Sequence, residues 1–247
     1  MQMDGFLTLK GSNVELVGAP ETIFVLPIGH VVSSKGEFDV DDESYKAMKA
    51  QIAKRGVEIE CIHFFSYPYT SELAKEKVLE LAHIMTKFCG RMTVDIVGFT
   101  EIQEAIRDHC REEYFTIIMR RFMMRIAEAI GRDHGAKCLV TGENLGQVAS
   151  QTMDAMAVTG AVVHMPIFHP LIGMDKEEIV TVARRIGTLE TSILPYEDCC
   201  TVFTPKHPRT RPVLKYVKEA QEKPNFEPLV EEALQNLKVT KISADDE

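Results

Sequence analysis

Two adjacent cysteines, Cys199 and Cys200, are the residues whose type and spacing most directly suggest chemistry. They lie in the polar, proline-flanked stretch PYEDCCTVFTPKHP, and the cations Lys206, Arg209 and Arg211 follow shortly after. Positive charge near a thiol lowers the thiol pKa and favours the reactive thiolate. A packing pair and a metal site are the alternatives, although the sequence contains no CxxC spacing. The pair is therefore a candidate for thiol chemistry.

The other four cysteines occur singly within apolar segments. They are Cys61, Cys89, Cys110 and Cys138. A buried thiol is the commonest explanation for such a cysteine. Six cysteines in 247 residues are also too few for a disulfide scaffold, so we expect these four to be structural.

A second candidate is the glycine-containing segment TGENLGQVASQT (141–152). Gly142 and Gly146 stand where the backbone must turn or approach a ligand closely. The segment is expected to open a helix near residue 144, whose free N–H groups can receive an anion. Side-chain donors follow on about one face: Gln147, Ser150 and Gln151. An ordinary strand-to-helix turn is the alternative to a nucleotide site.

Asp175 and Lys176 begin another predicted helix. The aspartate is a suitable N-cap, and a lysine beyond a parallel strand is well placed to meet a phosphate. A solvated lysine is the alternative.

Short β-branched runs alternate with longer helical patterns, which is typical of βαβ units. The predicted strands are 22–28, 57–65, 91–99, 136–142 and 162–167. The predicted helices are 42–55, 71–89, 101–134, 144–158, 175–186 and 212–237, the last interrupted near Pro224. The strands are near-continuous apolar runs, so helices should cover both of their faces. The fold class is therefore α/β, a Rossmann-like parallel sheet with helices on both faces.

The carboxyl ends of parallel strands meet at one edge of a sheet, where ligands bind in such folds. We therefore expect the polar segments that follow each strand to gather there. A helical stripe instead predicts core packing. Its members are Ile117, Met119, Phe122, Met123, Ile126 and Ile130.

Charge and hydropathy limit the function classes. Lys and Arg number 28 against 37 Asp and Glu, giving a net charge of -9. This balance excludes a surface that binds nucleic acid everywhere, so only a local basic patch could do so. There is no apolar run of transmembrane length and no signal-peptide pattern, which predicts a soluble, cytoplasmic protein without membrane contact.

Several long segments together resemble one family. They are HFFSYPYTSELAKEKV, MRRFMMRIAE, LVTGENLGQVASQT, PLIGMDKEEIVTVARRIGT and PYEDCCTVFTPKHPRTRP. They are similar to the nucleotide-hydrolase (PP-loop) domain of the tRNA 4-thiouridine synthetases, or tRNA sulfurtransferases, over about residues 55–212. The resemblance implies an adenine nucleotide alpha-hydrolase-like fold.

The resemblance also implies an activity. In that family ATP and Mg²⁺ serve to adenylate a tRNA uridine, and persulfide sulfur from a cysteine desulfurase then replaces the uridine oxygen. Family members are commonly homodimers. Cys200 matches the position that handles sulfur, Cys199 would resolve a persulfide or pack, and Lys176 would assist adenylation. The residues implied around the nucleotide are His63, Phe64, Ser66, Gly142, Gly146, Gln147 and Gln151.

For tRNA, the implied phosphate contacts are Lys206, Arg209 and Arg211, with a solvated basic loop as the alternative. No set of protein metal ligands is predicted. Neither the family's N-terminal tRNA-binding region nor a carboxy-terminal rhodanese domain is expected in this chain.

The sequence departs from the family where its phosphate loop, Ser-Gly-Gly-x-Asp-Ser, is expected. Val40–Tyr45 (VDDESY) stands there, and no such glycine string occurs in the chain. The alternative function is therefore a catalytically inactive nucleotide- or protein-binding member of the same fold. Residues 1–55 also weakly resemble the start of Mu-type phage proteases, which suggests a fusion with its seam near residues 55–59; protease activity is a third hypothesis.

We accordingly predict three regions. Residues 1–56 form an atypical segment that supplies a strand, a loop and a helix. Residues 57–212 form the nucleotide domain with the cysteine loop, and residues 213–247 form a helical extension with an acidic tail.

Overall fold

The computed structural model describes residues 59–196, 199, 202–222 and 224–244, together with the backbone of four short strands near the N-terminus. Those strands form two antiparallel pairs, β1 (Thr8–Lys10) with β2 (Asn13–Glu15) and β3 (Val31–Ser33) with β4 (Gly36–Phe38). The predicted strand 22–28, the predicted helix 42–55 and Val40–Tyr45 lie outside the described residues.

A parallel pair of strands forms the centre of the described fold. β5 (Ile59–Phe65) pairs with β6 (Met92–Gly98) from Ile59 opposite Met92 to Phe65 opposite Gly98. They are joined by α2 (Glu72–Cys89), which begins at the side-chain cap of Ser71 and ends at Gly90, where φ is 80°. Both predicted strands, the helix and their order are confirmed.

An edge strand makes this sheet mixed. β9 (Lys238–Ile242) pairs antiparallel with β6, Ile242 lying opposite Met92. The sequence predicted a helix up to residue 237 and no strand after it. Five residues with little apolar alternation give a weak strand signal, and pairing with β6 determines this one.

The single helix predicted over 101–134 is wrong, because the structure has three elements there. They are α3 (Thr100–His109), the 3₁₀ turn Glu112–Tyr114 and α4 (Phe115–Asp133). Cys110 and Arg111 are extended, and the Cys110 thiol donates to the carbonyl of Ala220. Tertiary contact thus ends α3 where the apolar period alone suggested continuation.

The helix predicted from residue 144 is also wrong in its first part. α5 (Met153–Gly160) begins only after Thr152, whose hydroxyl accepts from the N–H of Ala155. Gly146 has φ of 79°, and its N–H donates to the carbonyl of Gln151 at 2.8 Å. Residues 144–151 therefore form a closed loop and cannot supply free helix N–H groups.

β7 (Leu139–Val140) and β8 (Ile167–Phe168) form a second parallel pair. After them come α6 (Lys176–Arg185) and α7 (Leu189–Ser192), and then α8 (Leu214–Gln221) and α9 (Glu227–Gln235). The predicted start of α6 and the interruption near Pro224 are confirmed.

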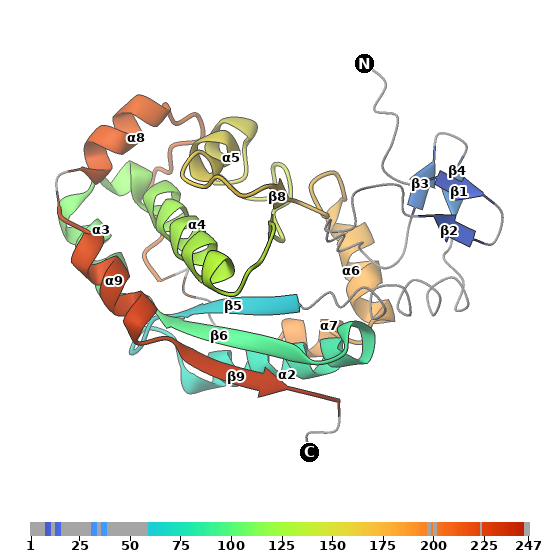
Figure 1. The fold of residues 1–247 in the computed structure, drawn as a ribbon. Helices are drawn as coiled ribbons and strands as arrows, with labels where there is room; N and C mark the ends of the chain where they lie inside the picture. The colour runs from blue at the N-terminus through green and yellow to red at the C-terminus, as the bar shows by residue number, and fades with distance from the viewer. Residues whose placement is uncertain are drawn as a thin grey trace.

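Helices cover both faces of the β5–β6 pair, α4 on one side and α2 on the other (Figure 1). The larger core cluster surrounds α4, and the predicted stripe is buried except for Met123, which is partly buried. In the described part of the chain, no helix is long and apolar enough to cross a membrane.

Candidate functional site

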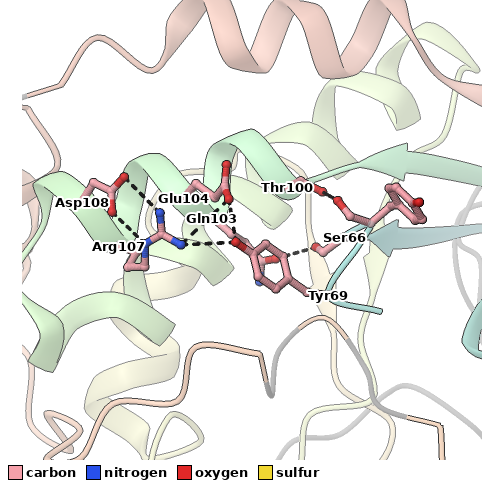
Figure 2. A network of polar contacts seen from close by, with 8 residues as sticks. Ser66, Tyr69, Thr100, Gln103, Glu104, Arg107 and Asp108 are labelled. Atoms are coloured by element: carbon pink, nitrogen blue, oxygen red, sulfur yellow. Dashed lines mark hydrogen bonds and ion pairs between the residues drawn. The ribbon is translucent and has the colours of Figure 1, made fainter. Parts of the chain in front are cut away.

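The carboxyl end of β5 is connected to the cysteine loop through one buried amide. Ser66 follows β5, is fully buried, and donates from its hydroxyl to Oε1 of Gln103 at 2.5 Å. The Gln103 Nε2 donates to the carbonyl of Cys199 at 2.7 Å. Figure 2 shows Gln103 on α3 facing Ser66. Because both groups of the amide are used, Gln103 fixes the strand end relative to Cys199.

The same loop is held at two further points. Upstream, the Lys77 Nζ on α2 donates to the carbonyl of Tyr196 at 2.9 Å. Downstream, the ring of Phe203 lies edge-on to Tyr69 at 4.9 Å, and the Arg107 guanidinium lies 5.1 Å from that ring. Tyr196, Cys199 and Phe203 are thus held against α2, α3 and the turn after β5.

A surface network reinforces this attachment (Figure 2). The Tyr69 hydroxyl donates to Glu104 at 2.7 Å and accepts from Arg107 at 3.4 Å, while Arg107 also pairs with Asp108. The Thr100 hydroxyl donates to the carbonyl of Tyr67 at 2.7 Å. The turn after β5 and the first turns of α3 therefore act as one unit.

Cys199 is buried and Cys200 lies outside the described residues. Three of the remaining cysteines have poor nucleophilic character. Burial raises the pKa of Cys110 to about 11, and burial also raises the pKa values of Cys61 and Cys138. Thiols with raised pKa values carry little thiolate near neutral pH, so these three are unsuited to carry reactive sulfur. They are partly rather than fully buried, so the expected burial is confirmed only in part.

The glycine segment is attached to the start of α6. The buried Asn144 donates from its side-chain nitrogen to the carbonyls of Leu171, at 2.8 Å, and of Met174. Asp175 then caps α6 through a capping box with Glu178. Lys176 is the first residue of α6 and its side chain is exposed. The segment and Lys176, predicted to share a site, are thus linked through residues 171–175.

Within that segment the predicted residues are placed differently from one another. Gly142, Gly146 and Gln147 are exposed, and a Cβ at either glycine would meet no described atom within 4 Å. Ser150 is buried, and Gln151 is half-buried with a buried Oε1 that accepts no hydrogen bond from the described part of the chain. Gln151 therefore retains an acceptor for a ligand.

An ionic cluster lies at the carboxyl ends of β7 and β8. The buried Glu143 pairs with Arg120 on α4 and, at 3.2 Å, with Nδ1 of His169. The Thr141 hydroxyl lies 2.7 Å from the same His169 nitrogen. The Arg120 guanidinium compensates the charge of this buried carboxylate, and the contacts together fix the two strand ends relative to α4.

Helix α4 brings the two halves of the site together. The Gln103 Nε2 donates to the sulfur of Met119 at 3.3 Å. The adjacent residue, Arg120, forms an ion pair with Glu143. Consecutive residues of one helix therefore touch both the β5 side and the β7–β8 side. Gln103, Arg120 and Glu143 were missed by sequence reasoning. Gln103 and Arg120 are polar residues on helices that bury an apolar face and Glu143 lies in a loop, but the partners that define their roles are distant in the sequence.

His63 and Phe64 point to opposite faces of the sheet, since side chains alternate along a strand. The Phe64 ring packs at 5.1 Å from Phe99 in the α4-side core. His63 lies 6.3 Å from Phe65 on the α2 side. The structure therefore does not bring these two side chains together, and Phe64 could contact a ligand only through its backbone.

The basic run is held by its backbone. The Lys206 N–H donates to Glu112 at 2.9 Å, and the Arg209 N–H donates to the carbonyl of Glu113 at 3.0 Å. Thr152 donates to the carbonyl of Thr210 at 2.6 Å. The side chains of Lys206, Arg209 and Arg211 are all exposed. Three cations are thus presented to solvent from a fixed backbone.

These features define the class of the protein: an α/β domain of the Rossmann-like kind with polar loops at the carboxyl ends of its parallel strands. The family model described as Thiamine biosynthesis protein (ThiI) matches residues 37–226. The chain belongs to this family. This match, over residues 37–226, begins before and ends after the region of about residues 55–212 in which the motifs resemble the family.

Curated relatives agree with this assignment. The chain is 58% identical over 194 residues to a "Probable tRNA sulfurtransferase" of Acetivibrio thermocellus, covering 78% of this chain and 50% of that protein. A relative of the same description from Brevibacillus brevis is 53% identical over 190 residues, covering 77% of this chain and 48% of that protein. The chain therefore spans about half the length of these relatives.

A solved structure is similar as well. It is described as a crystal structure of a 4-thiouridine synthetase–RNA complex with bound ATP. The TM-score is 0.72 with 39% sequence identity, covering 81% of this chain and 52% of that chain. The fold class predicted from the sequence is confirmed.

Proposed function

We propose that this chain carries the nucleotide- and sulfur-handling half of a tRNA 4-thiouridine synthetase. The observation that carries the proposal is the Gln103 amide, which joins Ser66 at the end of β5 to the backbone of Cys199. A sulfur carrier must reach the activated uridine, and this contact holds the cysteine loop at the strand edge where such folds bind nucleotides.

ATP is the proposed second substrate. The described residues fit its nucleoside end, because the β5 turn, the closed loop 144–151 and the free acceptor of Gln151 offer backbone and side-chain polar groups. Lys176 adds an exposed cation, which suits charge that spreads onto phosphate oxygens during adenylation. The segment that would meet the phosphates and Mg²⁺, Val40–Tyr45, lies outside the described residues.

The proposed reaction has two stages. The uridine oxygen attacks the α-phosphate and pyrophosphate leaves. The terminal sulfur of a Cys200 persulfide, loaded by a cysteine desulfurase, then displaces AMP. A second thiol attacks Cys200 Sγ, which breaks the sulfur–sulfur bond, releases 4-thiouridine and leaves a disulfide. Cys199 is an unfavourable second thiol because it is buried, so we assign it to packing.

The test compares Cys200→Ser and Lys176→Ala with the unchanged chain, in the presence of tRNA, ATP, Mg²⁺ and a loaded desulfurase. We expect Cys200→Ser to abolish 4-thiouridine formation and AMP displacement while pyrophosphate release continues, and Lys176→Ala to reduce the release of pyrophosphate as well. Cys89→Ser, at the end of α2, is the matched control and should change none of these products. Normal thiolation by Cys200→Ser would overturn the sulfur role.

We propose further that the chain acts in the cytoplasm, where tRNA and ATP occur, and that it forms a homodimer. Sedimentation velocity would test the dimer. A single species with the mass of one chain across the working concentration range would contradict it.

A non-catalytic member of the family is the second candidate. The observation that favours it is VDDESY in place of the glycine-rich phosphate loop. At an effective dielectric constant near 20, two like charges ~4 Å apart repel by roughly 4 kcal/mol before screening. Carboxylates at that position would thus oppose triphosphate binding. This candidate predicts that ATP binds no more tightly than AMP.

A further inference from the structure

Three potential metal ligands converge at a place that the proposed function does not use. Glu60 on β5, Asp95 on β6 and His134 at the end of α4 each direct one ligand atom into a common space, and these atoms all lie within 4.8 Å of one another. The register explains the convergence. Glu60 lies opposite Thr93 and Ile62 lies opposite Asp95, so both carboxylates occupy the α4 face of the sheet.

Asp95 is the unusual member of this group. Its side chain is fully buried, yet among the described residues neither carboxylate oxygen has a hydrogen-bond partner. The His134 Nδ1 lies 3.9 Å from Oδ2, which is beyond hydrogen-bond distance. A buried, unpaired carboxylate is costly, so its presence calls for a ligand or a proton.

His134 alone does not satisfy the two carboxylates. Its Nδ1 lies 2.8 Å from Glu60, so that nitrogen is already engaged. Burial, and then the nearby Glu60, raise the pKa of Asp95, while a hydrogen bond to Glu60 raises the pKa of His134. Two carboxylates thus share one imidazole, and a further cation among these three side chains would pair with the Asp95 oxygens that lack hydrogen bonds within the described structure.

We propose that Glu60, Asp95 and His134 bind a divalent transition-metal ion of the Zn²⁺ class. One imidazole and two carboxylates are suitable ligands for such an ion, whereas an all-oxygen set would favour Mg²⁺ or Ca²⁺. Two ligands of one ion, each bonded at about 2.1 Å, lie at most about 4 Å apart. The ligand atoms lie within 4.8 Å of one another, somewhat more than this limit. The side chains of Glu60 and His134 are 28% and 27% exposed, so a small rotation of either brings its ligand atom within bonding distance of a shared ion.

The place of the site indicates its role. Glu60 lies near the amino end of β5, whereas Ser66 and the cysteine loop lie beyond its carboxyl end. The bound ion would therefore join the end of α4 to both central strands without contacting the proposed reaction site. We assign it a structural role, and its presence or absence leaves the test of sulfur transfer unaffected.

The experiment is a calorimetric titration of the chelator-treated full chain with ZnCl₂. We expect saturable one-to-one binding. Asp95→Asn and His134→Asn should each weaken that binding by at least about tenfold, as expected for loss of a ligand or its support. Glu60→Gln, at a partly exposed position, is the variant least able to disturb folding, and it should weaken binding in the same direction.

Asp133→Asn is the matched control. It removes a carboxylate next to His134 whose side chain is 87% exposed, and whose oxygen lies 4.0 Å from the His134 Nε2. It should bind Zn²⁺ as the unchanged chain does, and Zn²⁺ should raise Tm in both but not in Asp95→Asn. Absence of Zn²⁺ binding to the unchanged chain would overturn the proposal. Equal binding by all four variants would also overturn it and would show that other groups bind the zinc.

Discussion

Gln103 shows how one side chain can set the geometry of a site. Its side-chain oxygen accepts a hydrogen bond from the Ser66 hydroxyl, its side-chain nitrogen donates one to the Cys199 carbonyl, and the residue is fully buried. Polar groups left without partners in such a place cost free energy. The side chain is therefore a positioning residue for the cysteine loop.

Gln103→Ala should lower the free energy of unfolding by about 1–3 kcal/mol, because it removes the buried hydrogen bonds to the Ser66 hydroxyl and to the Cys199 carbonyl. It should also slow 4-thiouridine formation more than pyrophosphate release, since the loop and not the nucleotide loses its attachment. Urea unfolding and product analysis measure the two effects. Gln235→Ala, on the exposed side of α9, should change neither. Equal slowing of both products would argue against a positioning role.

Glu128 gives a pH-dependent prediction. Burial alone would raise its pKa, but the N–H groups of His164 and Met165, at 2.7 and 2.8 Å, and Arg132 together lower the pKa below its usual value. A lowered folded-state pKa contributes stability above the unfolded pKa of about 4.3, and that stability is lost as pH falls further.

Glu128→Gln should therefore destabilise the chain at neutral pH by about 1–3 kcal/mol and less at acid pH. Urea midpoints measured at about pH 7 and about pH 4 give the comparison. Glu231→Gln, an exposed change on α9, is the control. A destabilisation that does not depend on pH would contradict the assignment.

At the residue scale, the sequence predicted which segments contribute to the site but not the side-chain contacts between those segments. Residue types and spacing indicated Lys176 and the segment 141–152, which the structure links through Asn144. They could not indicate Gln103 or Glu143, because partners distant in the chain determine their roles. Nor could they separate Phe64, which points into the core, from Ser66.

At the element scale, boundaries were predicted where local chemistry sets them. α2 and α6 begin at side-chain caps and are followed by glycines with positive φ, and their predicted limits are confirmed. The break between α3 and α4 and the late start of α5 depend on tertiary contacts and a closed loop, so the apolar period alone gave the wrong result.

Asp175→Ala tests the cap of α6. Its carboxylate accepts a hydrogen bond from the Glu178 N–H at 2.9 Å, and the Glu178 carboxylate accepts one from the Asp175 N–H at 2.7 Å. Loss of the cap should lower the free energy of unfolding by about 1 kcal/mol. Thermal unfolding measures this. Glu177→Ala, in the same turn without a cap, should have a smaller effect, and the reverse order would contradict the capping assignment.

At the scale of the whole molecule, the described strands do not form one continuous sheet: the mixed sheet β5–β6–β9 and the parallel pair β7–β8 are separate, and the two N-terminal antiparallel pairs are separate from both. The predicted strand 22–28 lies outside the described residues. The alternation of strands and helices therefore predicted the fold class and most of the element order. It did not predict β9, because that strand is determined by antiparallel pairing with β6 in the folded sheet.

The net charge of -9 makes RNA binding depend on local cations. If Arg209 and Arg211 contact tRNA phosphates, Arg209→Ala and Arg211→Ala should each weaken binding and reduce the salt dependence of log Kd by about one. Fluorescence anisotropy with labelled tRNA at several salt concentrations measures this. Lys215→Ala, an exposed cation on α8, is the charge-matched control; an equal effect there would indicate only general attraction.

Calorimetric titration with ATP and with AMP in the presence of Mg²⁺ tests whether this fold binds ATP for adenylation. We expect saturable binding of both nucleotides, with ATP bound more tightly than AMP because the phosphates add contacts. Binding of AMP without a gain for ATP, or absence of binding, would contradict this expectation and favour the non-catalytic candidate.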